Sequence, residues 1–305
     1  MIQTKLSAYD HLCRPLPSWH PKAWYYGLLA LSLRTVGQLS DGIRLGYRYG
    51  FDSGVMLEYV YQNRPGGITP VGTLIDWVYL NSQGWRGIRA RAALLQSTLR
   101  RVLHHYEGQP CHLLDVACGG GRYDLEVLRE WAPGAIAATL RDYKPENVAQ
   151  AQRLAQHLGV EAQIELGDAF ADRDLERVQP PPNVVVVSGL HEILPDDALI
   201  AHHFRQLYRL MAAPGTLIFT IQPHHPQLEL IARTLPAHTG RPWVMRLRSW
   251  ALTRHWAEAA GFRNVQVRLE PNGIFGVVTA EKAAAPGSQR VPAEGDVADL
   301  STPLD

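Results

Sequence analysis

Length, composition and charge set broad limits on this chain of 305 residues. Apolar residues make up 46% of it, which is enough for a large core or for two unequal domains. The formal net charge of +1 gives no whole-chain argument for binding nucleic acid or an anionic surface. Three cysteines without a CxxC pair indicate neither a disulfide framework nor a structural metal, so we expect a cytoplasmic protein without a bound metal.

The N-terminal region has a helical pattern throughout. Its best hydrophobic run, Trp24 to Leu33, is too short to span a bilayer, and the start of the chain lacks the apolar stretch of a signal peptide. The run favours an amphipathic helix that packs on the core, and a peripheral membrane contact stays open as the alternative. After an irregular lead-in to residue 23, further helices are predicted around Val55–Gln62, Val71–Leu80 and Trp85–Tyr106.

The pattern changes at Cys111, where short apolar runs begin to alternate with longer helical patterns. This alternation is typical of βαβ units and a parallel sheet. The turn Glu270–Gly273 is too short for a helix, so the two strands that it joins should pair antiparallel. The predicted strands are His112–Val116, Ala135–Arg141, Ala162–Leu166, Val184–Ser188, Thr216–Gln222, Val265–Leu269 and Ile274–Ala280. The helices predicted between them are Tyr123–Trp131, Pro145–Leu158, Ala198–Met211, Pro226–Leu235 and Ser249–Ala260.

These patterns divide the chain into three expected regions. Residues 1–110 form a helical cap that contributes to the substrate site, and residues 111–282 form an α/β domain. Residues 283–305 have no periodicity and few large apolar side chains, so we expect a disordered tail there.

A glycine-rich turn follows the first predicted strand. In the run Asp115–Gly121 the small residues Ala117, Gly119 and Gly121 let the backbone turn sharply and approach a ligand closely. Asp115 ends the strand, where its carboxylate can orient the turn or accept a hydrogen bond from an ammonium group. A lone turn of this kind is a weak signal, but this one follows an apolar strand and opens a helix.

Further polar positions follow the next strands. Asp142 stands 21 residues after Gly121 at the end of the second strand, where an acid can bind ribose hydroxyls. Asp168 and Ala169 follow the third strand, where a carboxylate and a backbone amide can read the edge of adenine. Ser188 ends the fourth strand and is assigned to the same site. Together these positions predict nucleoside binding.

The motifs resemble those of class I methyltransferases that use S-adenosylmethionine (SAM), from Cys111 to Lys282. In the resemblance, Asp115, Ala117, Gly119 and Gly121 match the first motif, Asp142 the ribose-binding acid and Asp168 the adenine contact, although the class commonly has glycine at the position of Ala117. Segments such as GIRLGYRYGFDSG and IDWVYLNSQGWRGIRAR also resemble a bacterial family of methyltransferase-like proteins, whose members occur alone or fused behind an α/β-hydrolase. The resemblance implies SAM as cofactor and a Rossmann-like, seven-stranded class I methyltransferase fold with an N-terminal helical cap.

Three residues are candidates for catalysis. Tyr143 follows Asp142 at the expected pocket mouth, where an aromatic face can hold a sulfonium cation. His191 and Glu192 follow the fourth strand, at the edge of the sheet that faces the ligand crevice, and either could act as a base. The same loop could instead simply cap a helix.

Two other polar groups lie beyond the fifth strand. His224 and His225 have no carboxylate or cysteine at metal-ligand spacing, so they are interpreted as surface loop histidines. Arg246 and Arg248 stand at alternate positions and could present a guanidinium group to a carboxylate or phosphate.

Three functions fit the sequence. The first is methyl transfer from SAM to a small-molecule or lipid-like acceptor, in secondary metabolism. The second is a SAM cyclase, in which the amine of SAM attacks its own γ-carbon to give azetidine-2-carboxylate and methylthioadenosine. The third is a non-catalytic SAM-binding protein. Nucleic acid is not expected as a partner, because no nucleic-acid-binding module is recognisable.

Overall fold

The computed structural model describes residues 8–284. The tail expected over 283–305 therefore lies outside the described residues, apart from its first two positions. Among residues 8–284, no helix combines the length and the apolar character that crossing a bilayer requires.

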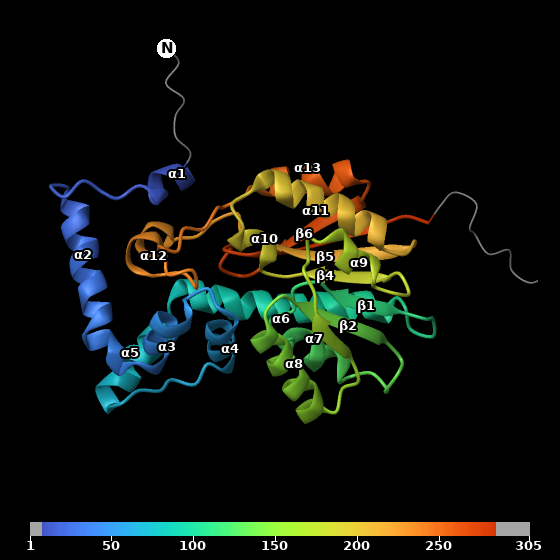
Figure 1. Ribbon diagram of the computed structural model, residues 1–305, viewed down its shortest axis with the longest axis horizontal. Coiled ribbons are helices and arrows are strands. Elements are labelled where there is room, and N and C mark those ends of the chain that lie inside the picture. The colour runs from blue at the N-terminus through green and yellow to red at the C-terminus, as the bar shows by residue number, and fades with distance from the viewer. Residues whose placement is uncertain (1–7, 285–305) are drawn as a thin grey trace, which may run out of the picture.

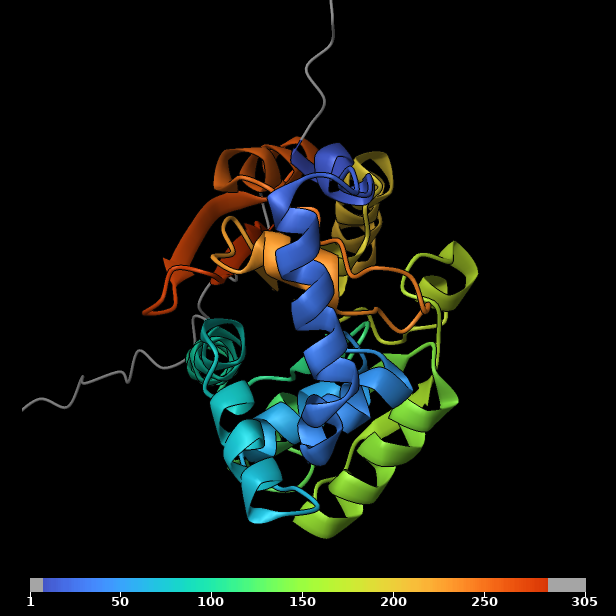
Figure 2. The same cartoon turned by 90° about the vertical axis from the view of Figure 1, so that its left-hand side faces the viewer.

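Helices form the N-terminal part of the chain, as the sequence predicts (Figure 1). Part of the expected irregular lead-in is a short helix, and a helix that was not assigned separately, α3, follows the first long one. Helix α2 extends along one end of the molecule, as Figure 2 shows from that side. The elements are α1 (Ala8–Cys13), α2 (Pro21–Arg34), the 3-10 helix η1 (Val36–Leu39), α3 (Asp41–Tyr49), α4 (Gly54–Gln62), α5 (Pro70–Leu80) and α6 (Gln83–His104).

All seven predicted strands are present in one sheet, in the order β3-β2-β1-β4-β5-β7-β6. The first five strands run parallel, and β7 pairs antiparallel with β6, as the short turn between them predicts, and also with β5. The strands are β1 (His112–Asp115), β2 (Ala137–Asp142), β3 (Gln163–Leu166), β4 (Val184–Val187), β5 (Gly215–Ile221), β6 (Arg263–Leu269) and β7 (Gly276–Lys282).

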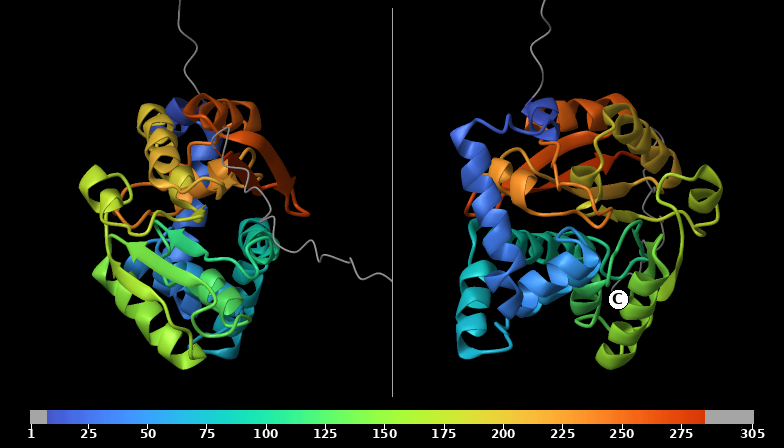
Figure 3. Two further views of the ribbon diagram at one scale, coloured as in Figure 1. Left: turned by 90° about the vertical axis from the view of Figure 1, so that its right-hand side faces the viewer. Right: turned by 60° about the vertical axis from the view of Figure 1, so that its left-hand side comes forward.

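Helices cover both faces of this sheet (Figure 3). The five helices predicted between the strands are present, and two short ones, α9 and α10, are additional. They are α7 (Arg122–Leu128), α8 (Pro145–Leu158), α9 (Asp172–Glu176), α10 (Leu190–Ile193), α11 (Asp197–Leu210), α12 (Leu228–Thr234) and α13 (Trp250–Ala260).

Strand β4 illustrates how the two faces are filled. Val184 and Val186 pack with side chains of α6 and α7, whereas Val185 and Val187 pack with those of α11 and α13. Alternate residues of a strand point to opposite faces, so a strand buried on both sides needs an unbroken apolar run. The four consecutive valines meet that need.

Helix α6 belongs to two hydrophobic clusters. Trp85 and Ile88 in its first turns pack with residues of α3, α4 and α5, whereas Leu95 and Leu99 further along pack against the sheet. At 1.5 Å per residue, its 22 residues reach about 33 Å. Because one rigid helix lies in both clusters, it fixes the N-terminal helices relative to the carboxyl edge of the sheet (Figure 1).

A buried carboxylate holds the N-terminal helices together. Asp76 on α5 has no exposed surface. Its oxygens accept hydrogen bonds from the Ser40 hydroxyl (2.5 Å), the Gly42 amide (2.8 Å), the Gly66 amide (2.9 Å) and the Tyr59 hydroxyl. These donors come from α3, α4 and the loop before α5. Burial and the neighbouring Asp76 raise the pKa of Tyr59, which therefore stays a hydrogen-bond donor.

Replacing Asp76 with Ala should lower the free energy of unfolding by about 3 kcal/mol or more, because buried donors would lose their acceptor. Chemical denaturation monitored by circular dichroism measures this loss. The control is Asp41→Ala, which removes a partly exposed carboxylate paired with Arg44 at 2.7 Å and should cost about 0.5 kcal/mol. Equal losses in the two variants would contradict the anchoring role of Asp76.

Candidate functional site

The carboxyl ends of the parallel strands bring the predicted binding residues to one edge of the sheet. Asp115 and Asp142 end β1 and β2, Asp168 follows β3 by two residues, and Ser188 directly follows β4. The strand order reverses between β1 and β4, where open α/β sheets bind ligands beyond the carboxyl ends of their strands. The candidate site therefore lies at this edge.

Asp115 organises the glycine-rich turn. Its Oδ1 accepts the Ala117 amide at 2.9 Å, and its Oδ2 accepts the Tyr123 hydroxyl at 2.6 Å. Gly119 and Gly121 have φ angles of 57° and 67°, a region that favours glycine. With no exposed surface, Asp115 orients the turn, which is the first of the two roles expected from the sequence.

Asp142 also supports the turn. Its Oδ2 accepts the Gly119 amide at 2.9 Å, and its Oδ1 accepts the Lys144 amide and the Asn147 side chain, each at 2.9 Å. A carboxylate offers about four acceptor positions, so about one is left for a ligand hydroxyl. Asp142 thus joins the turn to the start of α8, a structural role that sequence reasoning did not foresee.

A second buried acid lies against Asp115. Asp124 on α7 has no exposed surface, and neither of its oxygens has a hydrogen-bond donor among the described residues. Burial raises the pKa of Asp115 to about 7, and burial together with the charge of Asp115 raises that of Asp124 well above its usual value. We therefore expect the two carboxyl groups to share a proton near neutral pH, a prediction that is tested below.

The remaining predicted residues of this edge differ in exposure. Tyr143 is 60% exposed, with the Lys144 ammonium 5.5 Å from its ring centre. Asp168 is exposed and its Oδ1 accepts the Phe170 amide at 2.9 Å, while Ala169 is buried. These three residues lie outside the two cavities described next.

A small cavity of about 60 Å³ adjoins the glycine-rich turn. Residues 117–123 and Ser188 line it from the sheet side, and Gly54, Leu57, Glu58 and Tyr61 line it from α4. Glu58 joins α4 to the turn through an ion pair with Arg122, whose Nε lies 2.8 Å from the carboxylate. Helix α4 thus covers the turn.

A larger cavity of about 370 Å³ lies between the N-terminal helices and the sheet. Most of its lining is apolar, including Phe51, Tyr79, Trp85, Trp243 and Phe275. Leu57 and Arg91 line both cavities, so the two spaces meet at these side chains. Tyr79 and Trp85 face this cavity, whereas the side chain of Trp77 on α5 is 54% exposed.

Arg91 and Glu192 are charged residues in this apolar lining. They are 4% and 7% exposed, and the closest approach between their charged atoms, Arg91 Nη1 to Glu192 Oε1, is 3.9 Å. Neither oxygen of Glu192 has a hydrogen-bond donor among the described residues. Although burial acts to lower the pKa of Arg91, its neighbours Tyr61 and Glu192 raise it, which keeps the guanidinium charged. Glu192 is therefore a buried acceptor open to a ligand.

The side chain of His191 points into the core, whereas that of its neighbour Glu192 lines the larger cavity. Its Nε2 lies 2.9 Å from Nδ1 of His203 on α11, and its ring packs on Phe204. Burial, followed by the charges of His203 and Arg248, lowers the pKa of His191 well below its usual value. The side chain lines neither cavity. Of the two candidate bases in this loop, the geometry brings Glu192 to the cavity and His191 to the core.

His225 lines the larger cavity and is only 6% exposed, so its interpretation as a surface loop residue is wrong. Its Nδ1 accepts the Gln227 amide at 3.1 Å, which leaves Nε2 as the protonated nitrogen of a neutral ring. Burial lowers the pKa of His225 to about 4. Among residues 8–284, no three metal-binding side chains come close enough to hold a metal ion.

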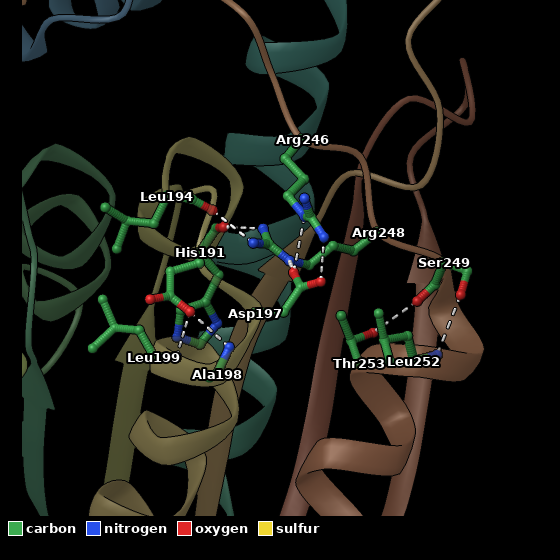
Figure 4. Close-up of polar contacts among 11 residues, drawn as sticks. His191, Leu194, Asp197, Ala198, Leu199, Arg246, Arg248, Ser249, Leu252 and Thr253 are labelled. Atoms are coloured by element: carbon green, nitrogen blue, oxygen red, sulfur yellow. Dashed lines mark hydrogen bonds and ion pairs between the residues drawn. The ribbon is translucent and has the colours of Figure 1, made fainter. Parts of the chain in front are cut away.

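Arg246 and Arg248 do present their guanidinium groups to a carboxylate, but to one within the protein. Both bind Asp197, with Arg246 Nη2 and Arg248 Nε at 2.5 and 2.9 Å from its oxygens (Figure 4). Arg248 also donates to the carbonyl oxygens of His191 (2.7 Å) and Leu194 (2.6 Å). These bonds fix both ends of the short segment that carries Glu192.

The sheet order defines a Rossmann-like protein with the seven-stranded fold of class I methyltransferases. The chain belongs to the family described as "Putative methyltransferase", which it matches over residues 2–282. It is 40% identical over 260 residues to "Uncharacterized protein YnbC" of Escherichia coli (strain K12), across 84% of this chain and 44% of YnbC. The chain thus spans less than half the length of that relative.

Two solved structures show the same fold. A "possible exported protein" from Bordetella parapertussis aligns with a TM-score of 0.65 and 21% identity, over 90% of this chain and 96% of that one. Magnesium protoporphyrin IX methyltransferase from Synechocystis PCC 6803, solved with bound SAH, aligns with a TM-score of 0.53 and 12% identity, over 85% of this chain and 99% of that one. At these identities the similarity concerns the fold alone.

The Asp115–Asp124 pair should make stability depend on pH in a defined direction. Burial raises the pKa of Asp115 from 3.8 to about 7, so the folded protein holds a proton that the unfolded chain releases. The contribution of protonated Asp115 to the free energy of unfolding is fully present below pH 3.8 and is lost as the pH rises through about 7. In the variant Asp124→Asn, the amide can donate a hydrogen bond to ionised Asp115. The decrease in the free energy of unfolding with rising pH should therefore become shallower, by up to about 1.4 kcal/mol per pH unit.

Urea unfolding of the wild type and Asp124→Asn, between about pH 5 and 8, measures this difference. Asp168→Asn, at an exposed strand-end acid, should keep the wild-type slope. Parallel curves for the wild type and Asp124→Asn would rule out a shared proton.

Proposed function

We propose that this protein transfers a methyl group from SAM to an apolar small-molecule or lipid-like acceptor. The observation that carries the proposal is the meeting of two cavities at Leu57 and Arg91. One adjoins the glycine-rich turn, and the other is apolar and closed by the N-terminal helices. Donor and acceptor could therefore meet without either one crossing bulk water.

The residues at the turn fit SAM in their chemistry. A side chain added at Gly119 would meet no atom within 4 Å, so the backbone there is open to close approach by a ligand. Asp142 retains about one acceptor position for a ribose hydroxyl. Asp168, Ala169 and Ser188 would complete the contacts at the ends of β3 and β4. The small cavity, at about 60 Å³, holds only part of a nucleoside, so we expect α4 to shift on binding.

The larger cavity sets the chemistry of the acceptor. Its walls favour an aliphatic or aromatic body, while Arg91, Glu192 and His225 offer a few polar contacts. The Glu192 carboxylate lacks a hydrogen-bond donor among the described residues, so it gains from a ligand that donates a hydrogen bond. We therefore expect an apolar acceptor with one hydroxyl or amine group.

SAM supplies an electrophilic methyl group when it is bound. Glu192 would accept the proton of the acceptor hydroxyl or amine, and the Arg91 guanidinium, 3.9 Å away, would face its carboxyl group. His225 would donate from Nε2 and orient the acceptor. Tyr143 and His191 remain hypotheses as catalytic residues. We place the reaction in the cytoplasm, where Cys13, Cys111 and Cys118, which are free thiols here, would stay reduced.

The turn can be tested by a matched pair of variants. Gly119→Ala and Gly134→Ala both replace a glycine of positive φ, 57° and 77°, whose added Cβ meets nothing within 4 Å. Each should cost about 1 kcal/mol of stability from backbone strain. Only Gly119→Ala intrudes where SAM would bind, so calorimetry should show at least about tenfold weaker SAM binding for it and little change for Gly134→Ala. Equal SAM affinities of the two variants would contradict a cofactor site at the glycine-rich turn.

The reaction is tested by identifying the adenosine product by mass spectrometry. With SAM alone we expect no turnover, and with a lipid extract or apolar alcohols and amines we expect S-adenosylhomocysteine and a methylated acceptor. Glu192→Gln should lower kcat by about 100-fold with SAM binding retained, because the amide cannot take the proton. The surface variant Glu161→Gln is the control and should keep wild-type kcat.

Formation of methylthioadenosine from SAM without an acceptor would contradict methyl transfer and support the SAM cyclase reaction. SAM binding without any product, over a broad set of acceptors, would leave a binding protein. Full activity in Glu192→Gln would remove Glu192 from the proposed chemistry.

A further inference from the structure

Helix α2 exposes an apolar surface that the other described elements of the protein do not cover. None of its 14 residues is fully buried, and Trp24, Leu28 and Leu31 are 74%, 70% and 57% exposed. These three positions follow helical spacing and form one stripe. Its only charged residues, Lys22 and Arg34, lie in its first and last turns. A helix that is apolar on nearly all sides normally lies in a core or in lipid.

Helix α5 adds a second exposed apolar stripe at the same end of the molecule. Val71, Leu74, Trp77 and Val78 are each more than half exposed. Helices α2 and α5 both pack on η1 and lie at one end of the molecule (Figure 2). We call these exposed residues of α2 and α5 the apolar face.

The apolar face is continuous with the larger cavity. Leu29 and Leu33 of α2 and Ile75 and Val78 of α5 line that cavity, while their neighbours on the same helices point outward. Val78 does both, since it lines the cavity and is 59% exposed. An apolar molecule bound at the face would therefore reach the cavity along apolar side chains.

The exposed charged residues in the N-terminal part of the chain are basic. In residues 8–90, seven of the eight lysine and arginine residues are exposed, and none of the five acids is among the exposed residues. The exposed bases are Arg14, Lys22, Arg34, Arg44, Arg48, Arg64 and Arg86. Lys22 and Arg44 also pair with Glu229 and Asp41. An exposed apolar face in a basic surrounding is complementary to a bilayer with anionic headgroups.

We propose that the apolar face docks on an anionic membrane surface, from which the acceptor passes between α2 and α5 into the larger cavity. Docking itself rests on the exposed side chains and their charge, whereas the delivery of an acceptor rests on the proposed function. A second copy of this chain is a poorer occupant, because a two-fold contact through this face would bring the basic residues of both copies together.

Vesicle flotation tests docking without any turnover, so its failure is distinct from failure of the methyl transfer. Wild type should float with phosphatidylcholine vesicles that contain about 30% phosphatidylglycerol, and less so with pure phosphatidylcholine or at high salt. Leu28→Glu should weaken binding by about tenfold or more. Leu166→Glu makes the same change at a residue that is 50% exposed on the edge strand β3, and it should bind like the wild type.

Tryptophan fluorescence checks the same face without a variant. Trp24 and Trp77 should be quenched in the wild type by vesicles of brominated lipid. The proposal is overturned if the wild type does not float with anionic vesicles, or if Leu28→Glu and Leu166→Glu bind equally well. A dimer in sedimentation velocity that Leu28→Glu dissociates, without vesicle binding, would assign the face to a second copy instead.

Discussion

Arg91 is positively charged and only 4% exposed, so interactions within the protein must compensate for its lost hydration. Its guanidinium lies 5.0 Å from the centre of the Phe275 ring and 3.9 Å from Glu192, and the neighbouring Tyr61 on α4 also raises its pKa. Three segments distant in sequence, around Tyr61, Glu192 and Phe275, therefore converge on this side chain of α6.

That convergence determines where the two cavities meet. Arg91 lies on α6, the helix whose apolar residues are divided between the N-terminal helices and the sheet. A shift of α6 would move the guanidinium away from Glu192 and leave a buried charge uncompensated, which costs several kcal/mol. The rigid helix and the buried charge thus restrain the same junction, one by packing and the other by electrostatics.

The sheet could be predicted because its requirements are local. A strand buried on both faces needs consecutive apolar residues, as in Val184–Val187, and each parallel crossover needs a helix between strands. The positions of Asp115, Asp142 and Ser188 at one edge follow from that topology. The short helices α9 and α10 were missed because four or five residues carry no clear periodicity.

The site was harder to predict because side-chain direction depends on packing between distant elements. His191 and Glu192 are adjacent, yet consecutive residues of a helix point in different directions, so only one can face the cavity. His225 looked like a loop residue, since its burial arises from α6 and the N-terminal helices rather than from its neighbours in sequence. Arg248 depends likewise on Asp197, 51 residues away. These contacts exist only once the helices are in place.

The N-terminal helices therefore do more than cover the glycine-rich turn. Helix α4 lies over the glycine-rich turn, α6 supplies the side chain between the two cavities, and α2 and α5 form the outer wall of the larger one. Electrostatic interactions strengthen as water is excluded, so a single carboxylate in an apolar space acts on a ligand more strongly than the same group at a surface. The helices that exclude water here are the same ones that carry the exposed apolar face. In the proposed reaction, access for an apolar acceptor and protection of the reacting groups thus depend on one set of elements, and movement of those elements should affect both.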